Sequence, residues 1–274
     1  MSVSPKRLSP RLRIPILILF TVLFAGLMVF VALQPKPKPT LDERMFRYVR
    51  HQAEKGDPKA QYDLAVFYGI GKGTAKNEAE AMKWIRKAAA QGEPKSQDTL
   101  GAFYANGGKG TPKDDIEAEK LFRKSAMQGL AEGQHHLACC YMDGRGIKQD
   151  EKQALEWFQK AAAQGYSDSE YHIAYMFLNG RGVTTNTIEG IKWLAKAAEK
   201  GHGPAQFCLG TAYATGTGVE QDNVQAYKWV SLALEQGKAD SRALPALKEK
   251  MTPEQVKEAE RLANEFKAKT TASN

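Results

Sequence analysis

The stretch HHLACC, residues 135–140, has the side chains most able to do chemistry in this chain. In a helix, His135 and Cys139 would lie four residues apart on one face, and His136 and Cys140 on another. Imidazole and thiolate are zinc ligands, so either pair could contribute to a metal site. The two pairs would point about 100° apart, because each residue turns a helix by that angle. This divergence counts against a shared metal ion.

The glycine-rich stretch YMDGRGIKQD, residues 141–150, could cradle a phosphate or simply reverse the chain. Related segments recur at 67–77, 103–114, 177–186 and 212–222. One chain rarely needs five copies of a phosphate site. The repetition therefore indicates a structural turn, in which glycine supplies backbone angles that other residues avoid.

The recurrence has a fixed period. Glycines expected to end a helix lie 36 or 37 residues apart, at Gly92, Gly129, Gly165, Gly201 and Gly237. A regular period of this length is the signature of a solenoid of stacked repeats. Each repeat has two helical stretches, joined by one of the glycine-rich turns.

The first helical stretch of each repeat has a leucine or isoleucine followed four residues later by an aromatic residue. The pairs are Leu64 and Tyr68, Leu100 and Tyr104, Leu137 and Tyr141, Ile173 and Phe177, and Leu209 and Tyr213. Both side chains fall on one helix face, which we expect to point into the core. Positions 135 and 140 match mostly aromatic or apolar residues in the other repeats, which favours packing over metal binding there.

The second helical stretch begins with a capping-box pattern, in which Asn or Asp precedes Glu or Gln by three residues. The cap positions are Asn77, Asp114, Asp150, Asn186 and Asp222, and the later positions are Glu80, Glu117, Gln153, Glu189 and Gln225. One register of this helix holds all the tryptophans, Trp84, Trp157, Trp193 and Trp229, with Leu121 in the second repeat. We expect this register to be part of the core.

These motifs follow the pattern A-Q-x-x-L-G-x-x-Y-x-x-G-x-G, an acidic cap, then A-x-x-W-x-x-K-A-A-x-Q-G, most clearly in residues 205–237. The pattern resembles the Sel1-like repeat family over residues 57–237, in five copies that agree in register. The resemblance implies an all-α, right-handed α-solenoid similar to tetratricopeptide arrays. It also implies a role as a protein-binding adaptor, often in bacterial envelopes, and it names no partner.

Terminal repeats need caps, because each would otherwise expose one apolar side. Residues 42–56 are expected to form an N-terminal capping helix, with Tyr48 at the tryptophan position. Residues 238–274 are expected to hold a C-terminal capping helix and a frayed tail. That helix should begin with Thr252 as its cap, Pro253 in its first turn and Gln255 completing a capping box.

The N-terminus is predicted to be a membrane anchor. Residues 14–33 are twenty residues without a charge, long enough to cross a bilayer. A cleaved signal peptide is the alternative, although its apolar region would be shorter and no A-x-A-like site follows. Residues 1–13 would be a basic cytoplasmic tail and residues 34–41 a Pro/Lys stalk. The weak charge bias then predicts a single-pass protein of the bacterial inner membrane with its C-terminal domain in the periplasm.

The charge distribution argues against nucleic acid as a partner. The net charge of +8 comes mainly from residues 1–40, which hold six basic residues and no acidic ones. The remainder is nearly balanced, whereas a nucleic-acid-binding domain should carry a basic face. Three cysteines, Cys139, Cys140 and Cys208, cannot complete a disulfide framework. No motif indicates a cofactor.

Nothing in the sequence identifies a catalytic centre. There is no G-x-S-x-G nucleophile motif, and the histidines fall in repeat positions or at helix ends. We therefore expect a protein that is not an enzyme. A cell-wall-active or β-lactam-binding enzyme is the alternative, because some proteins of the resembled family have been associated with cell-wall ligands.

Variable positions of the first helices are the candidate partner-binding site, because solenoids recognise partners through such residues on a concave face. The predicted site residues are Asp63, His136, Met142, His172, Tyr175 and Leu178. Aromatic and methionine side chains suit a protein-binding hot spot, although packing variants would give the same pattern. The sequence thus predicts a membrane-tethered adaptor or scaffold that binds another protein, possible versions being an envelope assembly factor or an immunity-type protein that sequesters a toxin.

Overall fold

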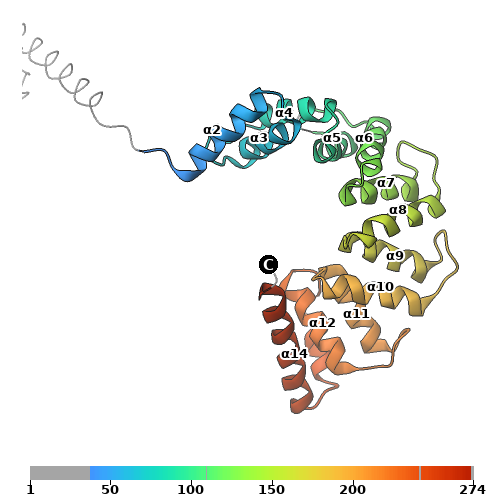
Figure 1. The fold of residues 1–274 in the computed structure, drawn as a ribbon. Coiled ribbons are helices and arrows are strands. Elements are labelled where there is room, and N and C mark those ends of the chain that lie inside the picture. Colours follow the sequence, from blue (N-terminus) through green and yellow to red (C-terminus); the bar gives the residue numbers. More distant parts are fainter. Residues whose placement is uncertain (1–37, 109, 241, 273–274) are drawn as a thin grey trace, which may run out of the picture.

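The computed structural model describes residues 38–108, 110–240 and 242–272, and every regular element of that part is an α-helix. The helices follow one another along a curved path, with α2 at one end and α14 at the other (Figure 1). The predicted all-α solenoid is confirmed. The helices are α2 (Leu41–Glu54), α3 (Pro58–Ile70), α4 (Glu78–Ala90), α5 (Pro94–Asn106), α6 (Asp115–Met127), α7 (Ala131–Asp143), α8 (Glu151–Ala163), α9 (Ser167–Asn179), α10 (Thr187–Glu199), α11 (Gly203–Thr215), α12 (Asn223–Glu235), α13 (Ala243–Lys248) and α14 (Pro253–Ala272).

Each repeat is a pair of helices of 13 residues, from α3 with α4 to α11 with α12. The turn between them needs both of its glycines for different reasons. In the third repeat, Gly144 ends α7 in the left-handed conformation, at φ 70°. A Cβ on Gly146 would lie 2.0 Å from the carbonyl oxygen of Asp115, at the start of the previous repeat's second helix. The second glycine therefore lets consecutive repeats stack closely.

The core is a series of hydrophobic clusters that join neighbouring helix pairs. The predicted leucine or isoleucine position is buried in every repeat, with exposed fractions from 0% to 8%. Phe158, which follows Trp157 in the second helix of its repeat, is also fully buried. It packs with Ile173 and Met176 of the next repeat. Each repeat thus completes its core against the following one, as the periodic pattern predicts.

The tryptophans correct one expectation. Trp229 is buried, with 5% of its surface exposed, but Trp84, Trp157 and Trp193 are only half-buried. A lysine three residues later covers the outer face of each of these three rings, for example Lys160, whose Nζ lies 3.7 Å from the Trp157 ring centroid. Such cation–π contacts suit a ring at the core boundary.

The predicted capping boxes are half formed. The Asp150 carboxylate accepts from the backbone N–H of Gln153 at 3.0 Å, and the other four second helices have the same contact. The reciprocal contact does not form, because the backbone N–H of Asp150 donates instead to the carbonyl oxygen of Tyr141 at 2.9 Å. The turn thus places a carbonyl oxygen of the first helix against the backbone N–H of Asp150, which in a complete capping box would donate to the Gln153 side chain.

Buried glutamines link the repeats, a feature that the sequence pattern did not predict. The amide of Gln134 donates to the carbonyl oxygen of Ala126, near the end of the preceding repeat. Its own carbonyl oxygen accepts from the amide of Gln164, 2.8 Å away at the end of α8. These contacts satisfy polar groups at two helix ends without water.

The two ends differ slightly from their predicted bounds. Helix α2 begins at Leu41 rather than after it, because Thr40 and Glu43 form a complete capping box. At the other end, Thr252 and Gln255 form the predicted box, and α13 precedes it unpredicted. Helix α14 extends to Ala272, and the last two residues of the predicted tail, 273–274, lie outside the described residues.

The predicted tail, anchor and most of the stalk, residues 1–37, lie outside the described residues. Within residues 38–108, 110–240 and 242–272, none of the helices combines the length and the apolar character that a bilayer span requires.

Candidate functional site

The first helices α3, α5, α7, α9 and α11 present a row of variable side chains. We call it the first-helix face and define it by two adjacent positions in each helix. These are Tyr62 and Asp63, Asp98 and Thr99, His135 and His136, Tyr171 and His172, and Phe207 and Cys208. Most of these side chains are half-buried, which places them at the boundary between core and solvent.

The six predicted site residues differ in how far their side chains are exposed to solvent. Tyr175 is the most accessible, with 41% of its surface exposed. Asp63, His136 and His172 are half-buried on the first-helix face. Met142 is buried in the core, at 8% exposure, beside Phe158 and Met176. Leu178 is half-buried, and its side chain fills the space left by Gly190 on the neighbouring helix. Met142 and Leu178 are therefore packing residues.

Aromatic and imidazole rings join the middle repeats along this face. His136 donates from Nδ1 to the carboxylate of Asp98 on α5, 2.7 Å away. The ring of His135 lies 5.0 Å from that of His172, measured between centroids. His172 in turn stacks on Phe158 at 4.9 Å. The contacts tie α5, α7 and α9 into one surface.

Burial keeps two of the HHLACC groups, His135 and Cys139, in their neutral forms. It lowers the pKa of His135 to about 3, so this imidazole stays neutral, hydrogen-bonded to Ser169 Oγ at 2.9 Å. Burial also raises the pKa of Cys139 to about 12, and its Sγ lies 3.6 Å from His135 Nε2. A protonated thiol is a poor nucleophile and a poor metal ligand. In the described part of the chain, no three His, Cys, Asp or Glu side chains converge to hold a metal ion.

A carboxylate and a histidine form a pair near this face, at the start of α9 and α11. Asp168 lies 3.4 Å from His202 Nε2, and the hydrogen bond from His202 holds the pKa of this carboxyl below its usual value. His202 Nδ1 accepts from the backbone N–H of Ala205 and so caps α11. This histidine therefore has a structural role.

The first two repeats hold an apolar hollow that the sequence analysis missed. It measures about 220 Å³ and lies between α3 and α5, with α4 also lining it. Val66 and Ile70 stand at its edge with 38% and 67% of their surfaces exposed. Its other lining side chains include Tyr62, Met82, Ile85, Thr99 and Phe103. Val66 aligns with Tyr175, so the same repeat position is apolar and accessible in both places.

A second hollow, of about 480 Å³, meets the first at Tyr62. Lys59, Asp63, Glu93 and Lys95 surround it with both signs of charge. Burial raises the pKa of Asp63 above its usual value. We call the two hollows together the α3–α5 groove. A groove with an apolar hollow and a charged hollow beside it is suited to a peptide segment with one or two apolar side chains.

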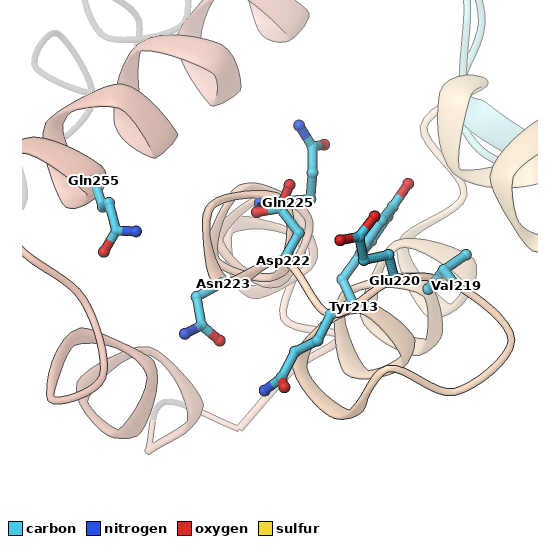
Figure 2. A pocket seen from close by; sticks show the side chains of 8 residues that line it. Tyr213, Val219, Glu220, Asp222, Asn223, Gln225 and Gln255 are labelled. Carbon is cyan, nitrogen blue, oxygen red and sulfur yellow. Dashed lines mark hydrogen bonds between the residues drawn. The ribbon is translucent and has the colours of Figure 1, made fainter.

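A further hollow, which is polar, lies between the turn before α12 and the helix α14 (Figure 2). Its volume is about 970 Å³. Asp222 accepts from two backbone N–H groups of α12, and Gln255 accepts from the backbone N–H of Thr252. These side chains serve as helix caps, which explains why they gather there.

Two solved structures resemble most of the chain. A Sel1 repeat protein from Oxalobacter formigenes is 27% identical, with a TM-score of 0.69, and the match covers 88% of this chain and 95% of that one. A protective antigen present in uropathogenic Escherichia coli strains is 28% identical, with a TM-score of 0.65 over 82% of this chain. This chain spans just over half, 56%, of that antigen's length. Among curated proteins, the comparison found no match.

The sequence model of the Sel1 repeat matches five consecutive segments, 58–93, 94–130, 131–166, 167–202 and 203–238. Each segment holds one of the helix pairs described above. The segments begin and end within one residue of the predicted array, 57–237. With five matched repeats over most of its length, the chain belongs to the Sel1 repeat family.

Proposed function

We propose that this protein is a membrane-tethered adaptor or scaffold that binds a segment of another protein along its first-helix face. The observation that carries the proposal is the three accessible apolar side chains one or two helical turns from that face on the same first helices, Val66 and Ile70 on α3 and Tyr175 on α9. Aromatic and aliphatic side chains at the edge of a hollow are the usual anchors of a protein interface. Asp63, His136 and His172 would add polar contacts beside them.

The tether is the second half of the proposal. Residues 14–33 would anchor the chain in a membrane, with the repeats on the periplasmic side of a bacterial inner membrane. Two features of the sequence support this anchor: the uncharged run is long enough to cross a bilayer, and basic residues precede it. The protein should stay with the membrane after carbonate extraction, and deletion of residues 1–33 should release it. Release of the intact, uncleaved protein by carbonate would contradict the tether.

The partner site is tested by crosslinking in cells of the source organism. A photoreactive phenylalanine placed at Ile70 or Tyr175 should crosslink one partner. The same group at Ile188, which lies on α10 and is 61% exposed, is the matched control and should not crosslink it. Ile70→Ser should reduce capture of that partner at least as much as Tyr175→Ala with His172→Ala, while Ile188→Ser should leave it unchanged.

Equal crosslinking from all three positions would show that the first-helix face is not the binding site. The identity of a specific partner decides between the two biological versions. An envelope component would indicate an assembly adaptor, and a toxin would indicate an immunity protein. Turnover of a peptidoglycan fragment or a β-lactam by the purified protein, abolished by a single substitution, would instead support the alternative of a cell-wall-active enzyme.

A further inference from the structure

Helix α2 has an exposed apolar stripe that its own repeat array does not cover. Leu41, Met45 and Tyr48 follow a helical spacing of four and three residues, with 70%, 42% and 66% of their surfaces exposed. The opposite side of the same helix is buried, where Phe46 and Ala53 pack with Leu64 of α3. Neighbouring exposed apolar side chains of this kind are a common mark of an interaction surface.

The repeat pattern explains why the stripe is open. Met45 and Tyr48 align with Ala81 and Trp84 of α4, which pack against the first helix of their own repeat. Helix α2 is a lone second helix, and no first helix precedes it in the described part of the chain. The stripe is therefore the open end of the solenoid.

Charge is arranged around the stripe in a specific way. At about 100° per residue, Arg44, His51 and Lys55 fall on the line beside it. Glu43 and Glu54 fall on the far side of the helix by the same count. The acidic Asp42 faces Lys72, with 3.9 Å between the carboxylate and the ammonium. The apolar stripe thus has a basic border along one edge, and basic residues beside an apolar face are typical of helices that lie on an anionic membrane surface.

We infer that α2 lies flat on an anionic lipid surface, with Leu41, Met45 and Tyr48 inserted among the headgroups and Arg44 and Lys55 facing the phosphates. The inference rests on the proposed tether. Residues 34–40 span at most about 25 Å even when fully extended, so an anchor ending at Leu33 would hold α2 close to the bilayer. A second copy is a poorer fit, since the other end of the array, α14, exposes the charged groups Glu258, Arg261 and Glu265.

Hydroxyl-radical footprinting of the full chain tests this without any label. The protein is reconstituted in nanodiscs of phosphatidylglycerol or of phosphatidylcholine, and oxidation is read at each side chain by mass spectrometry. Met127, 75% exposed on α6, is the internal control for Met45, and Tyr175 is the control for Tyr48. A second reference is the same protein released from the disc by cleavage at a protease site placed in residues 34–37. Phe46, 9% exposed, should stay unoxidised there if the fold is intact.

We expect oxidation of Met45 and Tyr48 to fall roughly threefold in phosphatidylglycerol discs relative to the released chain, with Met127 and Tyr175 unchanged. The fall should be smaller in phosphatidylcholine discs. Arg44→Gln with Lys55→Gln should remove the difference between the two lipids. The matched control is Lys120→Gln with Lys124→Gln on α6, which should preserve it.

Equal oxidation of Met45 and Tyr48 in discs and after release would overturn the inference while leaving the tether intact. Protein that is not recovered with the discs would overturn the tether, and this inference with it. Protection that persists after release would show that a second copy, and not lipid, covers the stripe.

Discussion

The carboxylate of Glu170 accepts from Lys200 Nζ at 2.7 Å, at the position where the other four repeats join two glutamines. In those repeats the first glutamine also donates to a carbonyl oxygen eight residues earlier, such as that of Ala198. A carboxylate has no hydrogen to donate in that place. The second oxygen of Glu170, Oε2, is accordingly buried without a hydrogen-bond partner.

Restoring the common pair should stabilise the protein. In Glu170→Gln with Lys200→Gln, the new amide can donate to the carbonyl oxygen of Ala162, and the orphaned acceptor disappears. We expect a gain of about 1–2 kcal/mol in the free energy of unfolding, measured by urea denaturation of the repeat domain. Lys200→Gln alone should instead destabilise it, because the buried carboxylate then loses its cation. A double variant that unfolds at lower urea than the wild type would contradict this account.

The second glycine of the turn should be far less replaceable than the glycine that ends a helix pair. Gly146 has φ 70°, and a Cβ there would meet the Asp115 carbonyl at 2.0 Å. Gly129 also has a positive φ, 89°, but a Cβ there would have no neighbour within 4 Å. Gly129→Ala should therefore cost about 1 kcal/mol from backbone strain, and Gly146→Ala at least about 3 kcal/mol from strain and displacement together. Calorimetric melts of the two variants compare them, and similar losses would show that repeat stacking does not depend on this contact.

The tryptophans that share one position of the second helix should contribute unequally to stability. Trp229 is buried against Phe266 of the terminal helix, with ring centroids 5.3 Å apart, so Trp229→Ala should cost about 3–5 kcal/mol. Trp157 keeps part of its ring in solvent under Lys160, and Trp157→Ala should cost about 2 kcal/mol. Chemical denaturation measures both. If Trp157→Ala proves the more damaging change, burial is not what sets the difference.

His135 should make the protein sensitive to acid. Its pKa is about 3 in the folded state, against an ordinary value of 6.5. Between these two pH values the imidazole is protonated in the unfolded chain and neutral in the folded chain. The stability it contributes is complete above pH 6.5 and is lost as the pH falls from there towards 3. In this window the free energy of unfolding should fall by about 1.4 kcal/mol per pH unit more in the wild type than in His135→Phe.

The comparison uses urea titrations at several pH values. His51→Phe, which removes an exposed histidine from α2, controls for the loss of a histidine. Identical slopes for the wild type and His135→Phe would show that the imidazole is not kept neutral by burial.

Much of the fold could be predicted because its determinants are local and repeat. A leucine and an aromatic residue four apart define the inner face of a first helix whatever lies beside it. Asn or Asp before a second helix caps it through atoms three residues away. Gly92 and its equivalents end helices because few other residues accept that backbone conformation. Because each of these patterns occurs five times, the period of the repeat could be recognised from the sequence, and the period predicts the solenoid.

The candidate site could be predicted only in part. Met142 and Tyr175 both stood out as variable positions, yet Met142 is buried and Tyr175 is exposed. Val66 occupies the same variable position as Tyr175, yet neither Val66 nor Ile70 is among the predicted site residues. Their exposure depends on how far α5 lies from α3 and on which side chains of α4 fill the space between them. No signal within one helix carries that information.

The sequence by itself determined the period, the two helices of each repeat, the caps and the residues that must be glycine, since each of these follows from interactions within a few residues or from strict repetition. The tertiary structure alone decided which variable side chains reach solvent, where the α3–α5 groove opens and which face of α2 stays uncovered. The reason is physical. Burial of a side chain is settled by the neighbouring repeat, whose side chains lie some 36 residues away and differ in size from copy to copy.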